Sequence, residues 1–221
     1  MRETYLYHGI YFCCDEHIYY DHEKTMRILE DVCKSGSLLS RRKQGIDNCK
    51  DINFAGLDYI SFCDRKLRFA KPYEGKRILR KYTAYDSYIS NSLALGFDRK
   101  KIDVIDTNLV QPMFLEHKKE EKLSEYGLSI DIRYSDMADE VQVRDEVSLG
   151  NLKCLTLPVH LMNSRYAGVI YDCGDICRCI DDINNLMSDY GYVVPVYDLY
   201  SKELLNSEEQ VQKVLKKYRI G

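Results

Sequence analysis

The segment DEVQVRDEVSLGNLKCLTLP, residues 139–158, decides the fold class of this chain. Its first residues predict a strand, because Val141 and Val143 alternate with polar neighbours. Residues 148–153 then predict a one-turn connection, and alternating apolar side chains over residues 155–159 predict a second strand. The middle of the chain is therefore expected to be dominated by strands.

Further strands and helices are predicted on both sides of this segment. Asp21 is a suitable cap for a helix over residues 22–34, Gly36 is a natural stop, and a basic loop is expected over residues 37–49. A second helix is expected over residues 175–190, and a polar helix ends the chain. Strands between helices predict an α+β fold. The other predicted strands are residues 5–12, 56–63, 93–97, 101–107, 167–172 and 192–198.

Composition excludes several classes of protein. Of 221 residues, 45% are hydrophobic and 30% are charged, which is typical of a globular chain and not of a disordered one. The formal net charge of -3 argues against a polybasic nucleic-acid coat. No segment approaches the roughly 20 apolar residues of a membrane helix, so no membrane partner is expected. The charged N-terminal region does not resemble a signal peptide, and a cytoplasmic location with free thiols is the expectation.

Three fragments in this order resemble the ADP-ribosyltransferase superfamily. They are YLYHG at residues 5–9, GLDYISF at residues 56–62, and the segment 139–158. In that family an early strand supplies a His beside a small residue, a middle strand supplies an aromatic residue and a Ser, and a late strand begins with the catalytic Glu. The late strand, with the turn that follows it, is most similar to the DarT-type branch, which modifies nucleic acid. The resemblance implies a split β-sheet sandwich with flanking helices.

The resemblance implies that Glu140 is the catalytic residue and that NAD+ is the substrate. Cleavage of the bond between ribose and nicotinamide builds positive charge on the ribose, which a carboxylate stabilises. The same carboxylate can help to deprotonate the incoming nucleophile. His8 inherits the family's role of orienting NAD+, and Gly9 allows close approach of the backbone to the carboxamide.

Other residues are expected to complete the NAD+ site. Tyr59 or Tyr85 is expected to stack on the nicotinamide ring, because tyrosine offers a flat apolar surface with a polar edge. Ser61 is expected to line the same pocket or to bond a ribose hydroxyl. Arg41 or Arg42 is expected to pair with the pyrophosphate, because a guanidinium matches phosphate oxygens.

Two features depart from relatives. Arginine-modifying members carry Glu or Gln two positions before the catalytic Glu, where this chain has Ala138, so direct modification of arginine is not expected. Glu146, six residues after Glu140, is a second candidate carboxylate. Glu140 is preferred because it begins a predicted strand, whereas Glu146 is predicted to lie in the turn.

The predicted activity is NAD+-dependent mono-ADP-ribosyl transfer to a macromolecule, with nucleic acid favoured slightly over protein because residues 65–81 are strongly basic. The catalytic domain is expected over residues 1–160, with an α/β appendage over 161–221 packed on it. Residues 115–137 are expected to meet the acceptor. The family resemblance implies a bacterial toxin, effector or phage-defence component, with a possible antitoxin or inhibitor as partner. An NAD glycohydrolase, an RNA 2'-phosphotransferase and a non-catalytic binding module are the alternatives.

The cysteines near the C-terminal helix raise the question of zinc. Cys173, Cys177 and Cys179, with Cys154 or His160, have ligand-type side chains. Their spacing lacks the paired C-x2-C knuckles of structural zinc sites, so small buried apolar roles are expected and no metal is assigned.

Overall fold

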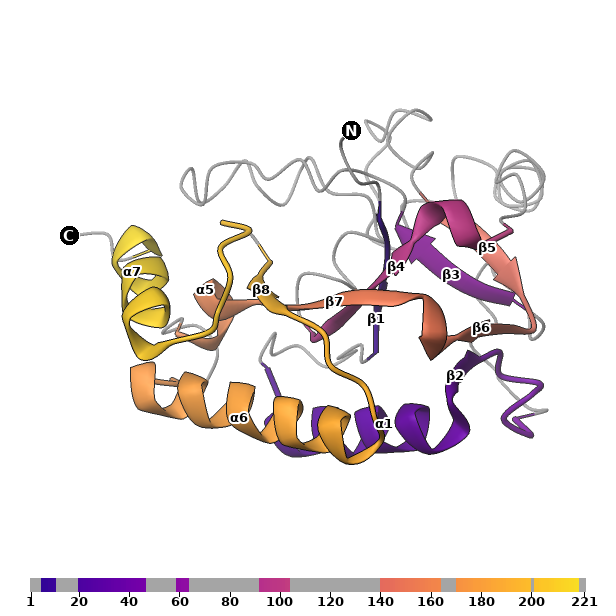
Figure 1. The fold of residues 1–221 in the computed structure, drawn as a ribbon, viewed down its shortest axis with the longest axis horizontal. Helices are drawn as coiled ribbons and strands as arrows, with labels where there is room; N and C mark the ends of the chain where they lie inside the picture. The colour runs from indigo at the N-terminus through magenta and orange to yellow at the C-terminus, as the bar shows by residue number, and fades with distance from the viewer. Residues whose placement is uncertain are drawn as a thin grey trace, which may run out of the picture.

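The computed structural model describes residues 5–10, 20–46, 59–63, 92–103, 140–163, 170–199 and 201–218. These residues form a mixed sheet, a separate two-stranded ribbon and helices (Figure 1). The α+β class predicted from the sequence is confirmed.

A six-stranded sheet forms the centre of the fold, in the order β5-β3-β1-β4-β7-β8. Neighbouring strands are antiparallel except for β7 and β8, which pair in parallel. The first described strand, β1, therefore lies inside the sheet, between β3 and β4. The strands are β1 (Tyr5–Gly9), β3 (Tyr59–Cys63), β4 (Ala94–Asp98), β5 (Glu140–Arg144), β7 (Leu152–Leu157) and β8 (Val196–Asp198).

A short ribbon of β2 (Ser37–Leu39) and β6 (Glu146–Ser148) stands apart from this sheet. The chain leaves β5 for β6 at Asp145, whose φ of 63° is left-handed, a conformation that Asp tolerates better than most residues. The 3-10 helix η5 (Leu149–Asn151) then leads directly into β7. The turn between β5 and β7 thus carries the second strand of the ribbon.

Helix α1 (His22–Ser35) has both its ends capped locally. The Asp21 side chain accepts a hydrogen bond from the Lys24 amide at 2.9 Å, and Gly36 closes the helix at φ 68°. Thr25, Leu29 and Cys33 follow the helical repeat and are buried. Capping and an apolar stripe together place α1 against the sheet.

Helix α6 (Cys173–Asp189) begins with a reciprocal capping box between Asp172 and Asp175. Its apolar face joins that of α1, and the Cys33 thiol donates to the Met187 sulfur at 3.5 Å. Both helices pack along one face of the sheet (Figure 1) and share one core with it. Burial of each large side chain in that core contributes about 1.5–3 kcal/mol. The buried side chains of α6 are Ile176, Cys179, Ile180, Ile183 and Met187.

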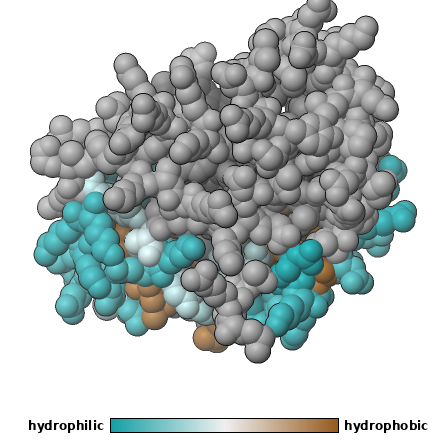
Figure 2. Space-filling view, turned by 90° about the horizontal axis from the view of Figure 1, so that it is seen from above, coloured by the Kyte–Doolittle hydropathy of each residue, from teal (hydrophilic) through white to brown (hydrophobic). Residues whose placement is uncertain are grey.

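The remaining described helices are η2 (Arg99–Lys101), which follows β4, and α5 (Val159–Met162) and α7 (Glu208–Tyr218), which lie near β8 (Figure 1). No helix in the described ranges is both long enough and apolar enough to cross a membrane. In the view of Figure 2, the described residues at the rim of the molecule are mainly hydrophilic, with small hydrophobic areas between them.

Several predicted boundaries were wrong. The predicted basic loop begins with strand β2, because Ser37–Leu39 pairs with β6. Residues 192–195 and 170–172 are not strands, and Val159 begins α5 instead of ending β7. Residues 101–103 belong to the end of η2 and the coil after it.

Candidate active site

Three neighbouring strands carry the residues that the sequence singled out. His8 lies in β1, Tyr59 and Ser61 lie in β3, and Glu140 is the first residue of β5. The order β5-β3-β1 makes these strands adjacent, although their residues are far apart in the chain. The fold thus brings the three sequence fragments to one part of the sheet.

The imidazole of His8 is fixed by a bond between strands. Its Nδ1 lies 2.8 Å from the main-chain carbonyl oxygen of Ser61. A carbonyl oxygen can only accept, so Nδ1 carries the proton and donates. Burial lowers the pKa of His8 below its usual 6.5, which keeps the ring neutral at pH 7. The Nε2 atom is therefore left as a hydrogen-bond acceptor, suited to a ligand hydroxyl or amide N–H.

The ring of Phe62 packs against this imidazole. The sequence analysis did not predict this role for Phe62. The two rings lie 5.4 Å apart with their planes tilted by 52°. Phe62 is fully buried and meets Phe97 edge-on at 5.7 Å. The alternation of side chains along β3 could have indicated it. This alternation places Phe62 on the opposite face of the strand from Ser61, and that face is covered by the core.

Glu140 is located by strand register. It stands opposite Cys63, and Cys63 stands opposite Tyr7. His8, opposite Leu95, belongs to the next cross-strand row. Two strand spacings, about 10 Å, separate the backbones of β1 and β5. Successive rows face opposite sides of a sheet, so register alone does not bring Glu140 and His8 to a common face.

The alternative carboxylate, Glu146, lies in a different place. It is exposed in β6 and stands opposite Leu39 in the two-stranded ribbon. It is therefore outside the sheet that contains His8 and Ser61.

Arg41 and Arg42 lie in an exposed turn that follows β2. The Ser40 amide donates to the Asp145 carbonyl at 2.7 Å, which ties this turn to the end of β5. Arg144, with 69% of its side chain exposed, lies at this end of β5 and pairs with Asp145 at 3.8 Å. The turn lies beside the opposite end of β5 from Glu140, about 13 Å along the strand. The two arginines and Glu140 therefore lie at opposite ends of β5.

The remaining predicted site residues are placed only in part. Gly9 stands opposite Ala94, and the backbone of Tyr59 stands opposite Arg144. Tyr85 lies outside the described residues, as do Ala138, the basic segment 65–81 and the predicted acceptor loop 115–137.

Solved structures of a DarT are similar to this chain. The complex of Thermus sp. 2.9 DarT with NAD+ is 13% identical, covering 91% of this chain and 98% of that chain with a TM-score of 0.40. The complex with carba-NAD+ is 12% identical over 89% and 95%, with a TM-score of 0.40. The complex with ADP-ribosylated ssDNA is 13% identical over 88% and 93%, with a TM-score of 0.36. Likenesses this low assign no ligand and no chemistry to the present chain. No protein-family model and no curated protein matches it.

The cysteines of α6 gather no metal site in the described part of the chain, where no group of three His, Cys, Asp or Glu side chains is placed to hold an ion. Burial raises the pKa of Cys177 to about 11 and that of Cys179 to about 12. Both thiols are therefore protonated at pH 7, and Cys179 packs in the core as a small apolar side chain.

Proposed function

We propose that the chain is an NAD+-dependent mono-ADP-ribosyltransferase. The observation that carries this proposal is the bond from His8 to Ser61, which joins β1 to β3 beside the strand that Glu140 begins. It supports a shared role for the first two resembling fragments, because it fixes the orientation of the only histidine in them, and β5 of the third fragment is the neighbouring strand. The second support is the family-like order of those fragments in the sequence.

The proposed reaction breaks the bond between C1' of the ribose and the nicotinamide nitrogen, and nicotinamide leaves with the bonding electrons. Glu140 stabilises the positive charge on the ribose, and a nucleophilic atom of the acceptor forms the new bond to C1'. The acceptor's proton passes to Glu140 or to water. Neutral His8 accepts a hydrogen bond from a ribose hydroxyl or from the carboxamide through Nε2.

The other proposed contacts follow the family resemblance. Gly9, Tyr59 and Ser61 line the nicotinamide pocket, and the main-chain carbonyl of Ser61 already accepts from His8. Arg41 or Arg42 binds the pyrophosphate. Because this turn lies at the other end of β5 from Glu140, the dinucleotide must be bound in an extended conformation. The acceptor is a nucleic acid in preference to a protein, because the sequence of residues 65–81 is strongly basic.

The test follows labelled NAD+ incubated with the full chain and with single-stranded DNA, RNA or protein. We expect transfer of label to one acceptor class, with free nicotinamide as the second product. Glu140→Gln keeps the size of the side chain and removes its charge, so the rate should fall by about 100-fold or more. Glu146→Gln is the matched control and should leave the rate within about twofold, since Glu146 is exposed in the ribbon.

Each contrary result has a definite meaning. If the unaltered chain consumes no NAD+ with any acceptor, the transferase proposal is wrong. Nicotinamide release without transfer identifies a glycohydrolase, and a cyclic phosphate product from RNA identifies a 2'-phosphotransferase. If Glu140→Gln transfers normally while Glu146→Gln does not, the catalytic carboxylate is Glu146.

A further inference from the structure

An open groove lies between α1 and α6, away from the strands of the proposed active site. Its volume is about 780 Å³. The side chains that line it come from both helices and from the two segments that precede them, including Asp21 and Tyr171. The groove is therefore a feature of the helical layer and shares no residue with the candidate NAD+ site.

The charge of this groove is strongly negative. Arg27 is the only lysine or arginine among its lining residues, which also include His22. His22 is already paired, through Nε2, with the carboxylate of Asp182 at 3.0 Å. Five carboxylates line the same space, namely Asp21, Glu23, Glu30, Asp182 and Asp189.

Three of these carboxylates are engaged within the described part of the chain, and the other two are exposed. Asp21 caps α1, Asp182 pairs with His22, and Glu30 forms an ion pair with Lys34 at 2.8 Å. Glu23 and Asp189 are exposed and make no ion pair within the described ranges. A positively charged partner would gain two new contacts there.

The carboxyl-terminal end of α6 adds to this negative potential. The groove is lined by the second half of α6, from Asp182 to Asp189, and the end of that half carries partial negative charge. Helix α6 has no basic residue in its last turn, and Asp189 ends it. A cation beside Asp189 would therefore interact favourably with both the carboxylate and the helix end.

The groove also offers apolar contact area between the charges. Met26 and Leu186 line it from the two helices, and both are half-buried and packed against the core. Tyr171 adds an aromatic side chain that is also half-buried. Such a surface matches a segment that carries apolar side chains among its cations.

We propose that the α1–α6 groove is a docking surface for a basic amphipathic segment of a partner protein. Lysine or arginine side chains of the partner pair with Glu23 and Asp189, and its apolar side chains cover Met26 and Leu186. The same negative charge repels phosphate groups, so a nucleic acid must approach the molecule elsewhere. This surface is independent of the NAD+ chemistry, and its test does not depend on enzymatic activity.

The probe is a synthetic helical peptide of lysine and leucine, labelled with a fluorophore and a photo-crosslinker, with a glutamate and leucine peptide as its counterpart. Binding to the full chain is measured by fluorescence anisotropy. We expect the lysine peptide to bind, to weaken as salt screens the charges, and to crosslink to α1 and α6. The double variant Glu23→Lys with Asp189→Lys should weaken binding by about tenfold or more.

A matched control has the same change in net charge outside the groove. Asp103→Lys with Glu209→Lys alters two other exposed carboxylates and should change the affinity by less than about twofold. Glu23→Gln with Asp189→Asn replaces the first variant if charge reversal prevents folding, and should still weaken binding measurably. Equal weakening by the groove and control variants, crosslinks outside the groove, or binding of a DNA oligonucleotide in the groove would each overturn the proposal.

Discussion

Gly96 is the residue whose small size the sheet depends on most clearly. It stands in β4 between Tyr7 of β1 and Cys154 of β7. A Cβ atom built there would lie 2.5 Å from the Cys154 sulfur and 3.1 Å from Cε1 of Tyr7. Both distances are shorter than ordinary van der Waals contacts, so only a hydrogen atom fits without movement of a neighbour.

We expect Gly96→Ala to lower the free energy of unfolding by about 1–3 kcal/mol, because the added methyl group overpacks the sheet. Cys154→Ala removes the closer obstacle. The double variant should therefore be less destabilised than the sum of the two single variants. Denaturant unfolding of all four proteins measures this coupling, and strict additivity would show that Cys154 is not the obstacle.

The candidate site shows how far single residues can be interpreted from sequence. His8 and Ser61 were expected to contribute to one NAD+ site, although no contact between them was predicted, and the structure places His8 against Ser61. The interaction is with the main-chain carbonyl of Ser61, 53 residues away, and not with its hydroxyl. Every residue has a carbonyl group, so side-chain identity could not reveal this contact. Strand register depends on the whole fold. The sequence therefore could not reveal that Glu140 and His8 lie in different cross-strand rows either.

At the scale of elements, local signals were reliable and long-range pairings were not. Asp21 and Gly36 fixed the ends of α1 because caps act within a few residues. Strand β2 was missed because it depends on pairing with β6, more than a hundred residues later. Residues 192–195 are apolar enough to resemble a strand, but Val193 is 89% exposed and only Val196–Asp198 pairs with β7.

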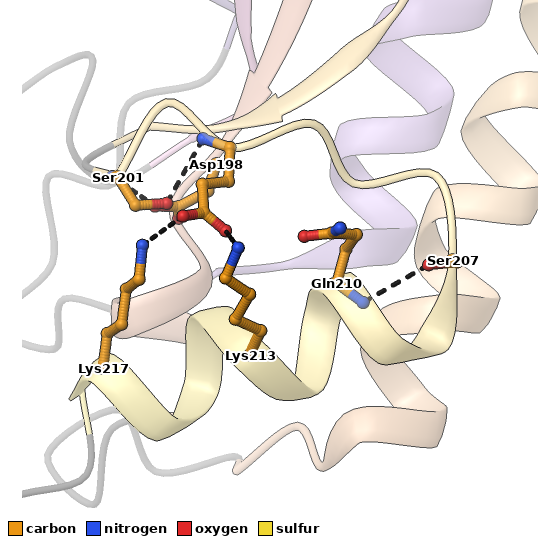
Figure 3. A network of polar contacts seen from close by, with 7 residues as sticks. Asp198, Ser201, Ser207, Gln210, Lys213 and Lys217 are labelled. Atoms are coloured by element: carbon orange, nitrogen blue, oxygen red, sulfur yellow. Dashed lines mark hydrogen bonds and ion pairs between the residues drawn. The ribbon is translucent and has the colours of Figure 1, made fainter.

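Helix α7 is attached to the edge of the sheet by a polar cluster (Figure 3). The Tyr218 hydroxyl donates to the carboxylate of Asp198, a fully buried residue at the end of β8. Closer to the surface, Lys217 and Lys213 both pair with Glu203, the latter at 3.4 Å. The hydrogen bond from Lys217 lowers the pKa of Glu203.

The two kinds of contact should differ in strength. We expect Tyr218→Phe to cost about 1.5–3 kcal/mol, because a buried carboxylate loses a donor. Lys217→Met should cost less than about 1 kcal/mol, because its ion pair is exposed to solvent. Thermal unfolding of both variants measures the difference. A larger loss for Lys217→Met would show that the surface pair, and not the buried hydroxyl, holds α7.

At the scale of the molecule, two desolvated imidazoles couple stability to pH. Burial lowers the pKa of His8, and it lowers the pKa of His160 to about 3. The unfolded chain binds protons near pH 6.5, whereas the folded chain keeps both rings neutral. Their contribution to stability is therefore complete above about pH 6.5 and decreases as the pH falls. For His160 this loss continues to about pH 3.

We expect the free energy of unfolding to fall by about 1 kcal/mol or more between about pH 7 and pH 5. In this window the carboxylates Glu30, Asp175 and Glu203, whose pKa values are lowered, stay ionised in the folded state. Urea unfolding across the window measures the slope, and His160→Leu should make it shallower. A slope that His160→Leu leaves unchanged would show that this ring is hydrated in the folded chain.

The interior position of β1 has a consequence for synthesis. A ribosome releases Tyr5–Gly9 before the other described strands, but both neighbours of this strand come from later parts of the chain, and one of them ends at Asp98. The sheet acquires its outer strand β8 only when Val196–Asp198 emerges. The nascent strand with its tyrosines must therefore wait, unpaired, until β3 and β4 have been synthesised. Chaperones that shield such early segments would have their main opportunity on this chain before β4 is made.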